Sequence, residues 1–333
     1  TERDFTGRDK YRNRLCNREV DFLLKSVNPD RNLMMAERHI SGGTKIIVNP
    51  AAGGGRTKAI WQDIERQIKK LGIDYSFIFT QGVGDATELA KAAVREGFKK
   101  IFAVGGDGTL NEVINGIELN QTTVGIIPTG SGNDLSKMIG IDGIADALAS
   151  LRYQERRRID LGRAGGRLFV NNLGVGFDAF VAATKKKFEI FRGNLGYLLS
   201  CLKVLCDFQA YEVEITADGH RFCDKIMSVS IGNGRFHGGC FKLTPEAVID
   251  DGLLDVCIIK ELNKMKSLFN IPKVIKGTHG CLKEVRSFKA KRIFLYSQRP
   301  LFVHLDGEVL LEPVKEIEIE ILPASLEVFI GKT

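Results

Sequence analysis

Glycines and one acid come together at Gly105-Gly106-Asp107-Gly108, a composition that suits the binding of a phosphate group. An apolar run ends at Val104 and apolar residues at helical spacing follow from Leu110, so the four residues form a turn between a strand and a helix. Glycines at such a turn let backbone N–H groups approach a phosphate at the positive end of the helix. Asp107 alone would repel a phosphate, but it suits Mg²⁺, which bridges phosphates and binds one or two carboxylates.

The residues after this turn exclude two familiar nucleotide motifs. A P-loop requires G-x-x-x-x-G-K-[ST] before a helix, and the only Gly-Lys-Thr of the chain is its last three residues. The dinucleotide fingerprint requires a third glycine where Asn111 stands. Thr109 and Glu112 instead fit a capping box, which predicts that a helix begins here.

From residue 44 onward, strand patterns alternate with helix patterns. Such alternation predicts a parallel sheet with helices on its faces, in which ligands bind beyond the carboxyl ends of the strands. The loops at those ends are rich in Gly, Asn, Asp, Ser and Thr, and we expect them to converge on one ligand. The strands are predicted at 45–49, 75–79, 100–104 and 123–127, and the loops at 49–55, 80–85, 105–109 and 128–134.

The period of the pattern changes to two after about residue 160. Val213 and Ile215 alternate with glutamates, as do Ile317, Ile319 and Ile321, which predicts mostly antiparallel strands. We therefore predict an α/β plus β fold, in which a Rossmann-like three-layer α/β domain precedes a β-sandwich-like domain and the site lies in the cleft between them. The predicted boundaries are a polar extension at 1–43, the α/β domain at 44–160, the β-rich domain at 161–323, and a return to the first domain at 324–333.

Composition limits the classes of protein that fit. The chain has 333 residues, of which 44% are hydrophobic, so it can bury the cores of two domains. Its seven cysteines are scattered and form no C-x-x-C pair, which favours a reduced, cytoplasmic protein. No apolar run approaches the roughly 18 residues of a membrane span, and the charged N-terminus does not fit a signal peptide. The net charge of +7 suits anionic partners such as nucleotide phosphates, acidic lipids or nucleic acid.

The longer stretch at 105–116 resembles the nucleotide loop of the diacylglycerol kinase catalytic family, which includes sphingosine and other lipid kinases. NAD kinases have a loop similar to its first five residues, so the other motifs decide between the two. These follow in the order of the lipid kinase family over residues 45–331, and the bacterial soluble branch is the most similar. The motifs are Asn49-Pro50-Ala51-Ala52-Gly53, Thr80 with Gly84-Asp85-Ala86, 128–134, 171–178, Gly232-Asn233-Gly234, 245–255 and Leu305-Asp306-Gly307-Glu308.

The resemblance implies an ATP-dependent lipid kinase that phosphorylates a lipid alcohol, diacylglycerol or a related lipid, with ATP and Mg²⁺ as cofactors. A carboxylate must accept the proton of the attacking hydroxyl. Asp306 and Glu308 are both candidates, with the resemblance favouring Glu308. Asp107 is expected to hold the metal or the γ-phosphate, or to be a rival base. The residues expected to bind ATP are Asn49, Pro50, Ala51, Ala52, Gly53, Thr80, Gly106, Asp107, Gly108, Thr109, Leu110, Asn111, Glu112 and Ser131.

A structural Mg²⁺ is also implied by the resemblance, bound by Asp251 and the backbone carbonyls of Val248 and Leu253. Without the family, two acids before a glycine would indicate an ordinary polar turn. The sequence departs from the family pattern in two places. Cys240 stands where a third glycine is usual and can crowd a turn near the site, and Ser136-Lys137 replaces the common Ala-Arg, which is a mild change.

Three other functions stay open. An NAD kinase-like small-molecule kinase would share the glycine loop, but it does not predict the motifs at 128–134 and 306–308 in this order. A non-catalytic nucleotide or lipid sensor would not need Asp107, Asp306 and Glu308. A nucleic-acid binder rests only on the net charge, because the basic run at 156–158 has no interleaved aromatics. We therefore expect no nucleic-acid partner.

A lipid substrate requires the enzyme to meet a membrane surface. Residues 179–206 combine basic and apolar positions, so they are interpreted either as a core-facing helix pair or as a peripheral membrane contact. Edge strands of the β-rich domain could pair in a homodimer. We expect a cytoplasmic enzyme that is peripherally associated with the membrane. The histidines show no metal-binding spacing and are expected to be structural: His39, His220, His237, His279 and His304.

Overall fold

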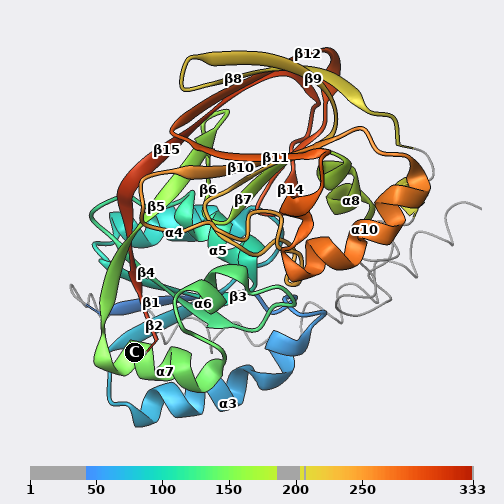
Figure 1. Ribbon diagram of the computed structural model, residues 1–333. Helices are drawn as coiled ribbons and strands as arrows, with labels where there is room; N and C mark the ends of the chain where they lie inside the picture. Colours follow the sequence, from blue (N-terminus) through green and yellow to red (C-terminus); the bar gives the residue numbers. More distant parts are fainter. Residues whose placement is uncertain (1–42, 186–202, 206–207, 332–333) are drawn as a thin grey trace, which may run out of the picture. The chain divides into compact units, whose positions relative to one another are not determined.

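The computed structural model describes residues 43–185, 203–205 and 208–331 (Figure 1). The polar extension predicted at 1–43 therefore lies outside the described residues, apart from its last position. Residues 186–202 and 206 of the segment at 179–206, which was interpreted as a helix pair or a membrane contact, also lie outside them.

The first part of the chain forms a parallel sheet between two layers of helices. The strands lie in the order β2 (Tyr75–Phe79), β1 (Thr44–Val48), β3 (Lys100–Gly105) and β4 (Thr123–Pro128). Figure 1 shows α4 (Asp85–Arg95) and α5 (Asp107–Ile114) on one face of the sheet and α3 (Arg56–Lys70) and α7 (Ile144–Tyr153) on the other. Strands β1, β3 and β4 are buried on both faces, as a sheet covered by helices requires. The short helix α6 (Asp134–Met138) follows β4.

The second part is built mainly from antiparallel strands around its own hydrophobic core. In β8 (Tyr211–Ala217), Val213 and Ile215 are buried in this core while Glu212 is exposed, so the alternation predicted the strand correctly. The strands of this part are β6 (Arg167–Phe169), β7 (Asn172–Gly176), β8, β9 (His220–Gly232), β10 (Leu254–Lys260), β11 (Val285–Ala290), β12 (Arg292–Leu301), β13 (Val303–Leu305) and β14 (Glu308–Val309).

Helices in the second part lie beside the sheet. They are α8 (Phe177–Lys185), α10 (Lys264–Lys276) and the 3₁₀ turn η2 (His279–Cys281), and Figure 1 shows α8 and α10 near each other. The sequence patterns did not predict α10. Among the described residues, every helix is too short or too polar to cross a membrane.

Two long strands connect the two parts. The first half of β15 (Val314–Phe329) pairs antiparallel with β12, and its last residues pair parallel with β4. Strand β5 (Arg156–Ala164) runs antiparallel to β15 along most of its length. As a result Ile319 of β15 lies in the second hydrophobic core and Phe329 in the first. The α/β plus β fold class predicted from the sequence is confirmed.

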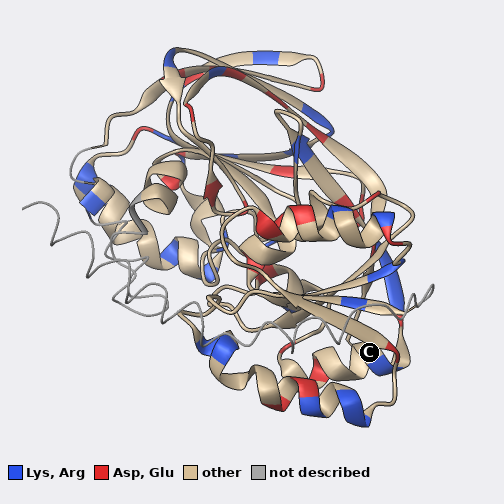
Figure 2. Ribbon diagram, turned by 180° about the vertical axis from the view of Figure 1, so that it is seen from behind, with Lys and Arg blue, Asp and Glu red and all other residues tan. Residues whose placement is uncertain are grey.

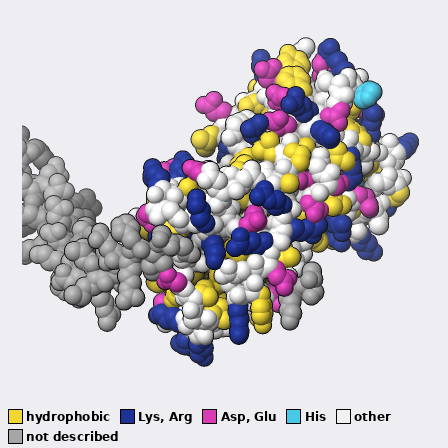
Figure 3. Space-filling view, turned by 90° about the vertical axis from the view of Figure 1, so that its left-hand side faces the viewer, with side chains coloured by type: hydrophobic (Ala, Val, Ile, Leu, Met, Phe, Trp, Pro, Cys, Tyr) yellow, Lys and Arg dark blue, Asp and Glu magenta, His cyan; other side chains and the backbone are white. Residues whose placement is uncertain are grey.

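Charged side chains are mixed over the molecule. Figure 2 shows basic and acidic residues distributed along both parts of the ribbon, and they are also interspersed on the face seen in Figure 3. The arginines of the basic run at 156–158 contact protein groups: Arg156 pairs with Glu327 (3.0 Å), Arg157 with Asp250, and Arg158 donates to the side-chain oxygen of Asn120 (2.6 Å). These side chains therefore fasten β5 to its neighbours.

Candidate active site

A cleft of about 480 Å³ lies where the loops after the parallel strands meet residues of the β-rich part. All four loops that were predicted to converge contribute to its walls. The β-rich part contributes the turn between β13 and β14, the start of β7 and residues of α8. The predicted site residues that line it are Asn49, Pro50, Ala51, Ala52, Gly53, Thr80, Gly106, Asp107, Gly108, Thr109, Glu112, Ser131, Asp306 and Glu308.

Two residues expected to bind ATP lie behind this wall instead. Leu110 is buried in the core of the first part. Asn111 is also buried, and its side-chain amide donates to the carboxylate of Asp306 (2.8 Å) and to the carbonyl of Leu168 (3.0 Å). Asn111 therefore connects α5 to the β-rich part.

The glycines of the loops after β3 and β4 allow their backbones to touch. A Cβ placed on Gly130 would lie 2.4 Å from the Cα of Gly106, which no side chain tolerates. Gly53, in the loop after β1, has a positive φ of 63°, and a Cβ there would lie 2.4 Å from the carbonyl oxygen of Thr129. The glycines thus bring three loops together and leave backbone groups at the cleft surface.

The capping box predicted for Thr109 and Glu112 is wrong. The N-cap of α5 is Gly106 and receives no side-chain hydrogen bond. Thr109 instead accepts a hydrogen bond from the Asn49 side chain (2.9 Å). The Glu112 carboxylate accepts hydrogen bonds from the backbone N–H groups of Gly84 (2.9 Å) and Ala86 (3.1 Å), at the start of α4. Both side chains therefore join separate loops of the cleft rather than closing their own helix.

Asp107 and Asp134 form an acidic pair on the cleft wall. The Asp107 carboxylate accepts a hydrogen bond from the backbone N–H of Asp134 (2.6 Å). Burial raises the pKa of both carboxyls, that of Asp134 to about 7, and the charge of Asp107 adds to the rise at Asp134. The buried Oδ1 of Asp134 has no hydrogen-bond partner among the described residues and lies 3.8 Å from the ammonium of Lys137. Hard oxygen ligands of this kind suit Mg²⁺.

Asp306 is held by the surrounding backbone. It adopts a positive φ of 48° in the turn after β13. Its carboxylate accepts hydrogen bonds from the backbone N–H groups of Val170 (2.7 Å), Asn171 (2.8 Å) and Asn172 (2.9 Å), in addition to the bond from Asn111. Burial raises the pKa of this carboxyl, and the N–H donors oppose the rise. With both oxygens accepting such bonds, Asp306 fixes the position of the turn.

Glu308 stands two residues later and is partly exposed to the cleft. A Cβ placed on Gly108 would lie 3.3 Å from its Oε1, so the carboxylate lies over the first turn of α5. No hydrogen bond to this carboxylate is formed within the described part of the chain. Its oxygens are thus available to a molecule that enters the cleft.

A buried cluster beside the cleft was not found by sequence reasoning. Asp178, at the start of α8, has its carboxylate 3.2 Å from Nε2 of His304 and 4.0 Å from Nδ1 of His237. Burial lowers the pKa of His237 to about 4, which keeps this imidazole neutral. Nδ1 of His304 accepts a hydrogen bond from the backbone N–H of Gly307 (3.2 Å). The cluster therefore supports the turn that presents Glu308, and the only sequence signal for Asp178 was its place in the 171–178 motif.

The residues expected to bind a structural Mg²⁺ lie away from the cleft lining. Asp251 is exposed; one of its oxygens accepts from the backbone N–H of Leu253 (3.1 Å) and the other from the ammonium of Lys289 (2.6 Å). Asp160 fastens the same loop by accepting from the backbone N–H of Gly252 (2.7 Å). Val248, Asp251 and Leu253 are thus in one ordered turn, and their role in metal binding stays a prediction.

Cys240 does not strain the turn in which it replaces a glycine. Gly238 and Gly239 have positive φ angles of 60° and 92°, but Cys240 does not. Its side chain packs with Val181, Val204 and Phe241 in a small hydrophobic cluster. Lys137, the other departure, donates to the carbonyl of Gly239 (2.9 Å) and so holds this turn against α6.

The site thus combines the glycine loops of a parallel α/β sheet with acids from a β-sandwich-like part. A family model described as the diacylglycerol kinase catalytic domain matches residues 44–164. A second, described as the YegS C-terminal NAD kinase beta sandwich-like domain, matches residues 171–330. Together the two matches span nearly all of the described residues.

Relatives of similar length support the same assignment. The diacylglycerol kinase of Bacillus subtilis (strain 168) is 32% identical over 269 residues, which cover 79% of this chain and 89% of the relative. That of Staphylococcus aureus (strain MRSA252) is 31% identical over 268 residues, which cover 79% and 85%. The crystal structure of a diacylglycerol kinase from Bacillus anthracis str. Sterne superposes with a TM-score of 0.67 at 26% identity, covering 87% of this chain and 97% of that one. The chain belongs to the diacylglycerol kinase catalytic family, as its motifs predicted.

Proposed function

We propose that this protein is an ATP-dependent lipid kinase, which transfers the γ-phosphoryl group of ATP to the hydroxyl of a lipid alcohol such as diacylglycerol. The observation that carries the proposal is the position of Glu308. This carboxylate, from the β-rich part, lies over Gly108 at the start of α5 in the α/β part. A proton acceptor from one part and phosphate-binding backbone from the other therefore face the same cleft. The relatives named diacylglycerol kinase support this substrate class.

The loops after the parallel strands would hold ATP. The helix N-terminus at Asp107 and the backbone of the neighbouring glycines favour phosphate groups. Asn49, Thr80 and Ser131 line the cleft on adjacent loops, where their polar side chains can contact the rest of the nucleotide. Asp107 and Asp134 would hold Mg²⁺, which when bound neutralises charge on the phosphate oxygens.

Glu308 would act as the general base. It would accept the proton of the lipid hydroxyl as that oxygen forms a bond to the γ-phosphorus, while the bond from the γ-phosphorus to the bridging oxygen breaks and ADP leaves. Asp306 is less suited to this role, because its two oxygens already accept four hydrogen bonds. We assign it the task of positioning the turn.

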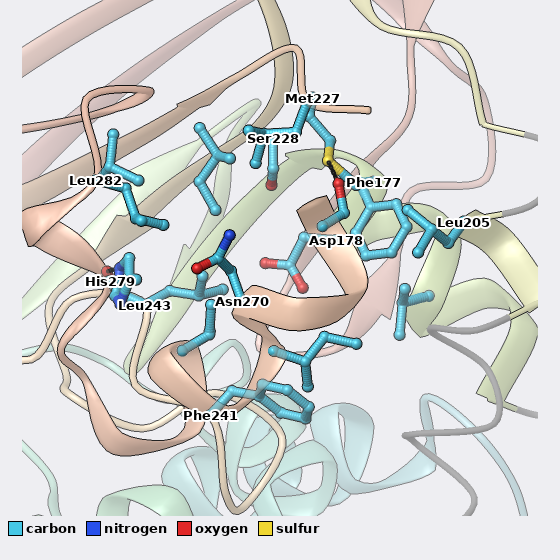
Figure 4. A pocket seen from close by; sticks show the side chains of 17 residues that line it. Phe177, Asp178, Leu205, Met227, Ser228, Phe241, Leu243, Asn270, His279 and Leu282 are labelled. Carbon is cyan, nitrogen blue, oxygen red and sulfur yellow. Dashed lines mark hydrogen bonds between the residues drawn. The ribbon is translucent and has the colours of Figure 1, made fainter. Parts of the chain in front are cut away.

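An apolar cavity next to the cleft supports a lipid substrate. It has a volume of about 100 Å³ and is enclosed mainly by apolar side chains, with Asp178 and Asn270 among them (Figure 4). Asp178 lines both this cavity and the cleft. A short segment of an acyl chain would therefore fit in the cavity while the hydroxyl of the same molecule reaches Glu308.

Incubation of the purified protein with radiolabelled ATP, Mg²⁺ and lipid alcohols in mixed micelles tests the proposal. We expect a labelled lipid, and we expect Glu308→Gln to lower kcat by about 10²- to 10⁴-fold, the usual contribution of a general base. Glu312→Gln, which changes an exposed acid outside the cleft, is the matched control and should retain activity. Labelling of NAD without labelling of any lipid would contradict the lipid kinase assignment, and normal kcat in Glu308→Gln would place the base elsewhere.

A further inference from the structure

Helix α10 has two apolar faces, and the described residues cover only one of them. The inner face lines the apolar cavity through Ile271 and Val274. The outer face carries Met265, Leu268 and Phe269, whose i, i+3, i+4 spacing places them side by side. Met265 is 61% exposed and Phe269 is 72% exposed. The outer face is therefore a hydrophobic patch on a helix that buries none of its residues.

The net charge around this patch is positive. The helix carries Lys264, Lys266, Lys273 and Lys276 and no acid. The acids near its start are paired with lysines, Glu284 with Lys266 and Glu261 with Lys225 (2.9 Å). Lys242 adds a further cation, since its backbone N–H donates to the carbonyl of Val274 near the end of the helix. Among the described residues Lys273 and Lys276 form no ion pair, whereas the arginine run on β5 is engaged by acids and an amide of the protein.

We propose that α10 is a membrane-docking helix, whose outer face inserts into the interfacial region of an anionic lipid bilayer. Helices that bind in this interfacial region typically have an apolar stripe flanked by lysines. Lysines also attract anionic headgroups. A second copy of the chain fits less well, because an isologous contact would set two cationic helices against each other.

The docked helix would stand between the bilayer and the lipid cavity. Its outer residues would contact acyl chains, and its inner residues line the cavity that adjoins the catalytic cleft. A lipid could then leave the membrane along the helix without exposing its chains to water. This last step rests on the proposed lipid kinase function, whereas membrane binding itself does not.

Vesicle flotation tests the docking surface directly. Wild-type protein is mixed with vesicles of phosphatidylglycerol and phosphatidylcholine in equal amounts, and the bound fraction is measured after centrifugation. We expect the double variant Met265→Ser/Phe269→Ser to bind about tenfold more weakly or worse, because two inserting side chains are lost. The matched control is Tyr153→Ser, which removes a 55% exposed aromatic from α7 and should bind as wild type does.

A charge variant separates the contribution of the lysines. Lys273→Ser/Lys276→Ser should weaken binding to the anionic vesicles about tenfold, with little change on vesicles of phosphatidylcholine alone. Its residual binding should also depend less on salt. Thermal unfolding of each variant shows whether the fold is intact, since all four side chains are on the surface.

Three results would overturn the proposal. The first is a wild-type protein that does not float with anionic vesicles, and the second is a folded Met265→Ser/Phe269→Ser variant that floats as the control does. In the third, this variant converts a dimer into a monomer without changing vesicle binding, which would make the patch a protein interface. Failure of the kinase proposal looks different, because the protein would then bind vesicles normally and phosphorylate no lipid.

Discussion

Two acids that are separated by one glycine, Asp306 and Glu308, meet very different surroundings. The Asp306 carboxylate accepts hydrogen bonds from three backbone N–H groups and one side-chain amide, whereas the Glu308 carboxylate faces the open cleft. We expect Asp306→Asn to lower the free energy of unfolding by about 2 kcal/mol or more, because an amide cannot accept the same set of donors. Glu308→Gln should change it by less than about 0.5 kcal/mol while abolishing most activity.

Urea unfolding of the two variants, followed by fluorescence, measures this difference. Wild type and the Glu312→Gln variant serve as references for an exposed acid. If both substitutions destabilised the protein equally, the separation of a positioning residue from a proton acceptor would be wrong.

The pKa of Asp134 predicts a pH-dependent stability. Folding raises the pKa of Asp134 from 3.8 to about 7, so the folded protein holds this proton more tightly than the unfolded chain does. The resulting contribution to the free energy of unfolding is fully present below the unfolded pKa and is lost as the pH rises through the folded pKa. Asp134→Asn stays neutral, so between about pH 4 and pH 7 it should become progressively more stable relative to wild type. Unfolding in the presence of a chelator measures the effect. Added Mg²⁺ should reduce it by favouring the ionised carboxylates, and parallel pH profiles of the two proteins would contradict the prediction.

Sequence patterns located the residues of the cleft better than they predicted their contacts. The capping box at Thr109 and Glu112 was wrong because such a pattern considers only local partners, whereas Glu112 meets backbone groups 26 and 28 residues away. Asp178 and His304 come from different elements, and nothing in their spacing indicates that the fold brings them together.

At the scale of elements, the four strands of the parallel sheet were predicted within one residue of their observed bounds. Helix α10 was missed for two physical reasons. Pro272 lies inside it, and its apolar residues face both the cavity and the solvent, so no single stripe with a period of 3.6 is visible.

The loop before β10 provides the test of the structural ion. If Asp251 binds Mg²⁺, the ion must compete with the ammonium of Lys289, which now lies 2.6 Å from the carboxylate. We expect Mg²⁺ to raise the melting temperature of wild type relative to a chelated sample, and Asp251→Ala to remove that response. Asp250→Ala, which alters the neighbouring acid paired with Arg157, should keep it. A wild-type melting temperature that is the same with Mg²⁺ and with chelator would exclude the ion.

At the scale of the whole molecule, β15 makes the core of the first part depend on residues far along the chain. Phe329 is fully buried there and stacks on Phe102 with a centroid distance of 4.9 Å. We expect Phe329→Ala to lower the free energy of unfolding by about 3 to 5 kcal/mol, as large truncations in a core do. Leu311→Ala, at a fully exposed position, should change it by less than about 0.5 kcal/mol. Chemical denaturation compares the two, and a small loss in Phe329→Ala would show that the end of β15 contributes little.

The fold class was predictable because two sequence patterns each extend over many residues. Strand and helix patterns alternate from the strand near Ile46 onward, and apolar residues alternate with polar ones in the later strands, as near Ile319. The pairing of β5 with β15 was not predictable, because nothing in the sequences of two strands some 160 residues apart indicates that they pair. The position of Glu308 over Gly108 likewise depends on the whole fold. Only the order of the family motifs suggested that these residues would meet.

The path of β15 also bears on how the protein is made. A ribosome releases β4 some 200 residues before Glu327, whose strand pairs with it. Until then the nascent α/β sheet presents β4 as an open edge with unpaired backbone groups, and such edges invite association with other chains. During synthesis the α/β part therefore passes through a long interval in which its sheet is incomplete and its edge strand is open to other chains.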